Sequence, residues 1–276
     1  MKKILAIVLA VAMIASVAML AGCGSKTADT ASKADAASAT EAADSGKTDD
    51  AKQTLTMATN AEFPPYEFKD DGVNIVGIDA EIAEKIAEKL GMELEIKDVD
   101  FSTIIEGVKS GKYDMGMAGM TVSEERLESV NFSTPYATGV QVVIVPENSP
   151  IKSVDDILAD GAQYKVGTQE ATTGYIYMLD DVGEERIVSF KSGNLAVANL
   201  LSNKVDCVVI DNEPAKAYVA ENPGLKILDT EYVTEDYAIC VAKENTELLD
   251  KINAALKELT DDGTIKAIID KYITAE

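Results

Sequence analysis

Histidine and tryptophan are both missing from this chain of 276 residues, and cysteine occurs only three times. Without histidine, the chain cannot form a Ser-His-Asp or Cys-His hydrolase site or the usual zinc sites. Cys207 and Cys240 lie in apolar runs typical of buried strands, where we expect two inert thiols rather than a disulfide. We therefore expect a protein that is not an enzyme and that carries no metal and no cofactor.

Positive charge is also scarce. Lysine and arginine total 25 against 48 aspartates and glutamates, so the formal net charge is 25 − 48 = −23. Nucleic-acid-binding proteins concentrate positive charge, so this balance argues against a nucleic-acid partner and against adsorption to anionic lipid. The acidic residues are best interpreted as solvated helix faces on a soluble surface.

A long apolar run occurs at the N-terminus. Met1–Lys3 is basic, 4–19 is almost entirely apolar, and Leu20-Ala21-Gly22-Cys23 closes the run. This layout is typical of an export signal and is too short for a membrane span. Leu-Ala-Gly-Cys resembles the bacterial lipobox, which implies removal of residues 1–22 and diacylation of Cys23. The alternative is an ordinary secretory signal that happens to contain a cysteine.

The next segment, residues 23–53, is made of Ala, Ser, Thr, Asp and Lys with almost no larger apolar side chain. Such a segment cannot bury enough surface to offset its ordering entropy, so it predicts a flexible linker behind the lipidated cysteine. From Leu55 onward, strand and helix patterns alternate. This alternation predicts an α/β fold, with too many units for one small sheet and therefore two α/β domains.

Seven segments between Leu55 and Tyr272 together carry a family resemblance. They are TNAEFPPYEF, VGIDAEIAEKIAEKLG, DFSTIIEGVKSGKYDMGMAGMTVSEER, VNFSTPY, VGTQEATTG, VDCVVIDNEPA and DDGTIKAIIDKY. In this order, behind a lipobox, they resemble the extracytoplasmic solute-binding proteins of polar-amino-acid ABC transporters. The resemblance implies a monomeric, lipid-anchored receptor that captures a free amino acid and passes it to a membrane permease.

The resemblance also implies a two-lobed fold of the type II periplasmic-binding-protein kind. Lobe 1 would comprise residues 54–140 plus 238–276, and lobe 2 residues 141–237. Two crossover strands, near Gln141–Val145 and Tyr237–Ala242, would join the lobes. A ligand that touches both lobes stabilises their closed arrangement selectively.

The carboxylate of an amino acid needs a cation in fixed geometry. Arg126 offers a bidentate fork, and its alternative role is a surface ion pair with a neighbouring glutamate. Thr172 and Thr173 stand where a helix is expected to begin, so their N–H groups favour an anion, although a plain helix cap is compatible with this. Thr121 adds a hydroxyl donor.

The ammonium group and the ligand side chain need other partners. We assign the ammonium to Asp211, whose alternative role is to cap the helix that follows, and to the Gly119 carbonyl. Phe63 and Phe101 are expected to flank the ligand side chain as two walls, with Tyr66 packed beneath Phe63.

Asn60, Glu62, Gln169 and Ile210 are left to discriminate between ligand side chains. Several binders of basic amino acids in this family carry aspartate where Asn60 stands. Asn60 and Gln169 can pair with a side-chain amide, so the first expectation is glutamine or another neutral polar amino acid. Because Glu62 is acidic, a basic amino acid remains the alternative ligand.

Two other classes of function fit less well. Some dehydratases share this fold, but without histidine only Glu62, Glu170 or Asp211 would remain as an acid or base. A sensor lipoprotein would usually bring a signalling domain, and none is expected from the sequence after Tyr272.

Overall fold

The computed structural model describes residues 52–229 and 231–273. The expected export signal, Cys23 and the linker as far as residue 51 lie outside the described residues. Within the described ranges, no helix is both long enough and apolar enough to cross a membrane.

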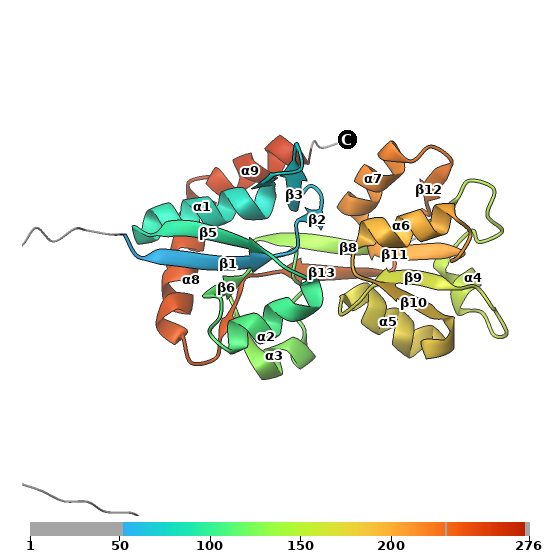
Figure 1. Cartoon of the computed structure of the whole chain (residues 1–276), viewed down its shortest axis with the longest axis horizontal. Coiled ribbons are helices and arrows are strands. Elements are labelled where there is room, and N and C mark those ends of the chain that lie inside the picture. The colour runs from blue at the N-terminus through green and yellow to red at the C-terminus, as the bar shows by residue number, and fades with distance from the viewer. Residues whose placement is uncertain (1–51, 230, 274–276) are drawn as a thin grey trace, which may run out of the picture. The chain divides into compact units, whose positions relative to one another are not determined.

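Lobe 1 is built on a five-stranded sheet with the order β5-β1-β6-β14-β7 (Figure 1). Its strands are β1 Thr54–Thr59, β5 Glu93–Asp98, β6 Met115–Gly116, β7 Val130–Phe132 and β14 Cys240–Ala242. β1 is parallel to both β5 and β6, whereas β14 is antiparallel to β6 and β7. The carboxyl ends of the parallel strands therefore meet at one edge of the sheet.

A small antiparallel sheet belongs to the same lobe and follows β1 in the chain. Its strands are β2 Glu62–Phe63, β3 Glu67–Asp70 and β4 Asn74–Val76, in the order β2-β3-β4.

Lobe 2 is built on a sheet with the order β10-β9-β11-β8-β12, in which β13 also pairs with β8. Its strands are β8 Ala137–Pro146, β9 Val166–Gln169, β10 Ile187–Phe190, β11 Cys207–Asp211, β12 Leu225–Ile227 and β13 Val233–Tyr237. β9 is parallel to β10 and β11, so their carboxyl ends also share an edge. Gln169 and Asp211 end two of these strands.

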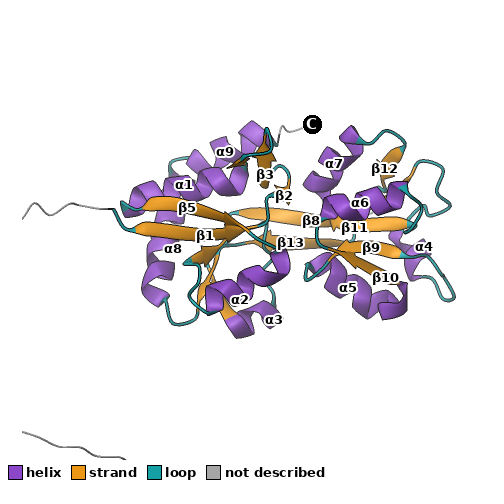
Figure 2. Cartoon of the chain, viewed as in Figure 1, coloured by secondary structure: helices purple, strands orange, loops and turns teal. Residues whose placement is uncertain are grey.

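Helices cover both sheets (Figure 2). Those of lobe 1 are α1 Ile78–Leu90, α2 Ile104–Lys109, α3 Glu124–Ser129, α8 Thr246–Asp261 and α9 Thr264–Tyr272, with the 3₁₀ turn η1 Phe101–Thr103. Those of lobe 2 are α4 Val154–Leu158, α5 Thr173–Val182, α6 Gly193–Leu201 and α7 Asn212–Glu221, with η2 Glu184–Arg186. α1 packs against β5, α8 and α9 through an apolar stripe at 3.6-residue spacing that includes Ile78, Ile82 and Ile86.

The connection between the lobes differs from the sequence prediction. β8 and β13 belong to the lobe 2 sheet and run side by side toward lobe 1, with 137–141 paired to 233–237 (Figure 1). The predicted single strand 237–242 is wrong, because it divides into β13 and β14. The backbone changes partners there: Ala238 N donates to Met120 O at 3.0 Å and Ile239 N to Ser133 Oγ at 3.0 Å. The exact lobe limits stay a prediction.

Asp79, in the first turn of α1, stabilises a neighbouring loop. The helix begins at Ile78 after Gly77, and no side chain caps it. Asp79 is fully buried and accepts hydrogen bonds from Gly119 N at 2.8 Å and from the Tyr136 hydroxyl at 2.8 Å. These bonds hold the loop that follows β6.

The two described cysteines are free and buried, as predicted. Cys207 packs in the lobe 2 core with Val143 and Val209, whereas Cys240 packs in lobe 1 with Ile104 and Val130. Burial raises the pKa of each thiol to about 12. Both thiols therefore stay protonated and unreactive at neutral pH.

Candidate ligand-binding cleft

One cleft gathers all ten predicted ligand-binding residues. It opens where the carboxyl ends of the strands of the two lobes face each other. Its lining consists of Asn60, Phe63, Phe101, Gly119, Thr121, Arg126, Gln169, Thr172, Thr173 and Asp211, together with Glu67 and Ala118. Glu62 and Ile210, which we expected to help discriminate ligands, are not among these residues, and Glu62 is exposed.

Arg126 is a buried cation that has no acidic partner among the described residues. Ser123 caps the short helix α3, accepting from Arg126 N, and so sets Arg126 in its first turn. Its Nη1 donates to Thr121 O at 2.7 Å, and its Nη2 donates across the cleft to Ala171 O at 3.0 Å. Burial lowers the pKa of Arg126, opposed by the nearby Glu235 charge, and Arg126 forms no ion pair with the acids of the described ranges. The surface ion pair with a neighbouring glutamate, the alternative role, is therefore not formed among the described residues. The guanidinium contacts neutral acceptors that a carboxylate can displace.

Asp211 ends β11 and occupies the N-cap position of α7, but its side chain makes no capping hydrogen bond. It accepts a short hydrogen bond from the Tyr237 hydroxyl instead. The pKa of Asp211 is raised from 3.8 to about 7, chiefly by burial. The Tyr237 hydrogen bond opposes this rise and the Glu235 charge contributes to it. The cleft thus holds an acid that a ligand cation would return to its ionised form.

The two threonines at the start of α5 use their hydroxyls locally. Thr172 Oγ1 donates to Gln169 O at 2.8 Å and accepts from Tyr175 N at 3.3 Å, which is a helix cap. Thr173 Oγ1 donates to Glu235 Oε2 at 3.0 Å and lies 3.5 Å from Thr121 Oγ1. The helix start therefore offers an anion mainly its backbone N–H groups.

The aromatic residues form the predicted stack on the lobe 1 side. The rings of Phe63 and Tyr66 lie 5.9 Å apart at an angle of 29°, with Tyr66 also edge-on to Tyr237 at 5.1 Å. The Phe101 ring lies 5.4 Å from the Arg126 guanidinium carbon, in cation–π geometry. A side chain at Gly119 would meet Phe63 at 2.7 Å, and its φ of +50° also favours glycine.

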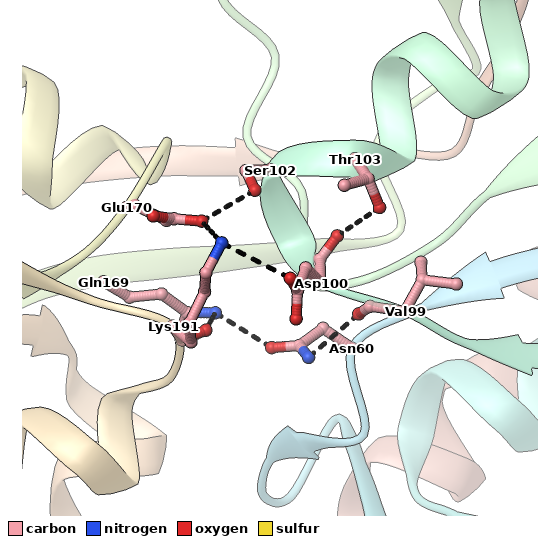
Figure 3. Close-up of polar contacts among 8 residues, drawn as sticks. All are labelled: Asn60, Val99, Asp100, Ser102, Thr103, Gln169, Glu170 and Lys191. Carbon is pink, nitrogen blue, oxygen red and sulfur yellow. Dashed lines mark hydrogen bonds and ion pairs between the residues drawn. The ribbon is translucent and has the colours of Figure 1, made fainter.

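Polar contacts join the lobes at the mouth of the cleft (Figure 3). Gln169 Nε2 of lobe 2 donates to Asn60 Oδ1 of lobe 1 at 2.8 Å, while Asn60 Nδ2 donates to Val99 O at 3.0 Å. Both polar groups of Asn60 are thus engaged, which weakens the expected pairing with a ligand amide.

A second set of contacts lies beside the first, and we call it the mouth cluster. It consists of Asp100 and Ser102 of lobe 1 with Glu170 and Lys191 of lobe 2 (Figure 3). Lys191 Nζ lies 3.3 Å from Asp100 Oδ2 and pairs with Glu170, which accepts from Ser102 Oγ at 2.9 Å.

Glu67 is the lining residue that the sequence reasoning missed. It is 1% exposed at the start of β3, and no hydroxyl, amide or backbone N–H of the described residues donates to either carboxyl oxygen. It faces Asp79, and burial followed by the Asp79 charge raises the pKa of Glu67 well above its usual range. Burial and the Asp79 charge therefore both favour the protonated form of Glu67. A glutamate between Tyr66 and Phe68, on a short strand of apolar neighbours, was the available signal.

Residues 55–275 match the family model of bacterial extracellular solute-binding proteins, family 3. This chain belongs to that family. It is similar to the arginine-binding extracellular protein ArtP of Bacillus subtilis (strain 168), at 30% identity over 83% of this chain and 89% of that protein. The family and these relatives bind solutes and are not enzymes, so the expectation of no enzymatic activity is confirmed.

Solved structures give the same result for the fold. An ancestral arginine-binding protein bound to glutamine is 40% identical, with a TM-score of 0.76 over 81% of this chain and 99% of that chain. An ancestral arginine-binding protein bound to arginine is 41% identical, with a TM-score of 0.75 over 80% and 99%. The predicted two-lobed α/β fold is confirmed.

Proposed function

We propose that this protein captures an amino acid between its two lobes outside the cytoplasm and delivers it to an ABC permease. In this proposal it is a monomer without its signal segment, held at the membrane by a lipid on Cys23 and the tether 23–53. The observation that supports it best is one buried cation and one buried acid that face the same cleft from opposite lobes. Arg126 and Asp211 are 6% and 8% exposed, respectively.

Each end of an amino acid would then engage a different lobe. Arg126, with Thr121, receives the carboxylate from lobe 1, and the first N–H groups of α5 add lobe 2 donors. Asp211 of lobe 2 receives the ammonium, with the Gly119 carbonyl on the other side. Because the ligand bridges the lobes, it stabilises their closed arrangement, and the permease recognises that arrangement.

We propose further that the ligand side chain is basic. Arg126 is the one cation among the lining residues, whereas Glu67 and Asp211 both line the cleft and Asp79 lies directly behind Glu67. A zwitterionic amino acid occupies Arg126 and Asp211 and leaves the Glu67–Asp79 pair for a side-chain cation. Arginine-binding relatives support this choice.

Glutamine is the second candidate. Asn60 and Gln169 line the cleft, and their mutual hydrogen bond can open to receive a side-chain amide. A related arginine-binding protein has been solved with glutamine bound.

Thermal unfolding of the purified protein against each of the twenty amino acids tests the proposal. A ligand that binds only the folded state increases the free energy of unfolding, by about 2.7 kcal/mol when its concentration is a hundred times its Kd. The melting temperature rises as a result. We expect arginine or lysine to give the largest shift. If no amino acid shifts the transition, the receptor proposal fails. A larger shift with glutamine would favour the second candidate.

Glu67→Gln tests the side-chain assignment. A side-chain cation favours ionised Glu67, whose protonated form is favoured without ligand, so we expect the affinity to rise with pH and binding to release a proton. In Glu67→Gln the affinity for arginine and lysine should fall at least tenfold, while neutral amino acids keep theirs. Calorimetry in buffers of different ionisation enthalpy measures the proton release. Equal losses for basic and neutral ligands would contradict the assignment.

A further inference from the structure

Glu235 is a buried acid that does not line the cleft, on the connecting strand β13. It is 5% exposed, and its Oε2 accepts from Thr173 Oγ1 at 3.0 Å and from Gln141 Nε2 at 2.9 Å. Its Oε1 has no hydrogen-bond partner among the described residues. The Gln141 side chain also hydrogen-bonds Asp211, to which Gln141 is opposite in the β8–β11 register. The Glu235 carboxyl thus contacts Thr173, near the proposed site of the ligand carboxylate, and Gln141, which lies next to the proposed ammonium partner Asp211.

We propose that Glu235 is the positioning residue that fixes the hydrogen-bond direction of Thr173 and, through Gln141, the placement of Asp211. This inference rests on the proposed function, because it concerns how the amino-acid main chain is held. Glu235 itself touches no ligand, since it lies outside the lining.

The chemistry of the carboxylate sets the direction of each hydrogen bond. An ionised carboxylate only accepts, so the Thr173 hydroxyl must donate its hydrogen to Glu235 and turn its lone pairs elsewhere. Thr121 Oγ1, at 3.5 Å, lies on that side. Because its single hydrogen is donated to Glu235, the Thr173 hydroxyl cannot also donate to the ligand carboxylate. The Thr121 hydroxyl has one hydrogen as well, and in the proposed complex it turns from Thr173 to the ligand carboxylate. The Gln141 amide likewise donates to Glu235, which fixes its orientation toward Asp211.

The negative charge of Glu235 also acts on Asp211 and Arg126. The Glu235 charge raises the pKa of both Asp211 and Tyr177, and it opposes the loss of charge on Arg126. Several ionisable groups besides Glu235 face Asp211 from the elements around it. They are Tyr237 on β13, Tyr66 just before β3, Glu67 at the start of β3, Arg126 on α3 and Tyr177 on α5.

Two variants of Glu235 separate the hydrogen bonds from the charge. Glu235→Gln keeps an accepting oxygen for Thr173 and Gln141 but removes the charge. At pH 8 we expect it to bind the wild-type ligand within about threefold of the wild-type affinity, with the acid limb of binding shifted to lower pH because Asp211 ionises more easily. Glu235→Ala loses both bonds and should weaken binding at least tenfold.

The control is Thr173→Val, alone and combined with Glu235→Ala. If Glu235 acts through Thr173, the loss in the double variant is smaller than the product of the two single losses. Multiplicative losses, an unchanged affinity in Glu235→Ala, or an unmoved acid limb in Glu235→Gln would each overturn the inference. Should Glu235→Ala fail to fold, the Glu235→Gln pH profile decides alone. Failure of the wild-type protein to bind any amino acid would overturn the proposed function instead.

Discussion

Arg126→Ala loses most of the affinity for any amino acid, whatever its side chain. Without Arg126, the ligand carboxylate is desolvated with no counter-charge, which costs about 2–5 kcal/mol, on the order of 30-fold or more in Kd. Isothermal calorimetry with the wild-type ligand measures the loss directly. As a control, the melting temperature of the ligand-free variant is measured to establish that the variant is folded.

Arg126→Lys is the matched variant. It keeps the charge but not the planar fork that reaches both Thr121 O and Ala171 O, so we expect an intermediate affinity. An affinity within threefold of wild type in Arg126→Ala would mean that the carboxylate is held elsewhere.

Asp211→Asn has opposite effects on binding and on stability. The variant leaves the ligand ammonium without an anionic partner, so the affinity falls by about 2–5 kcal/mol. The ligand-free protein becomes more stable at pH 8, by on the order of 1–4 kcal/mol, because a buried charge is removed. Calorimetry and thermal unfolding of the same sample test both effects. If Asp211→Asn bound the ligand as tightly as the wild-type protein does, Asp211 would have a structural role only.

The sign of the pH dependence follows from the raised pKa. The pKa of Asp211 in the folded protein is raised from 3.8 to about 7, so its contribution favours folding below pH 4 and is lost as the pH rises through 7. Binding runs the other way, since the ammonium needs the ionised acid. The affinity should therefore fall up to tenfold per pH unit below about pH 7, and Asp211→Asn should show no such acid limb.

The sequence predicted the fold and, through the family resemblance, ten residues that line the cleft, but it missed Glu67. Strand and helix periodicity predicts two α/β units, and polar residues that follow parallel strands must converge at the carboxyl edge. This geometry explains why residues as distant as Asn60, Arg126 and Asp211 line one cleft. Their individual roles stay a prediction, because lining a cleft does not say which atom of the ligand each residue contacts.

Three features could not be predicted from local pattern. The break between β13 and β14 depends on hydrogen bonds to Met120 O and Ser133 Oγ, more than a hundred residues earlier in the chain. Asp79 has a good cap sequence but finds stronger donors in tertiary contacts. Glu235 has the sequence appearance of a surface acid, and its burial depends on the packing of distant segments. The apolar neighbours of Glu67 hint at its burial but not at its position beside Asp79.

The contacts of the mouth cluster between the lobes should depend on the salt concentration of the surrounding solution. The Lys191 and Asp100 side chains are 57% and 53% exposed, so their attraction is worth about 1 kcal/mol or less and is screened within about 8 Å at physiological salt. None of these four residues is among those that line the cleft. In the proposed function, added salt should therefore weaken the closed arrangement of the lobes through this cluster, whichever amino acid is bound.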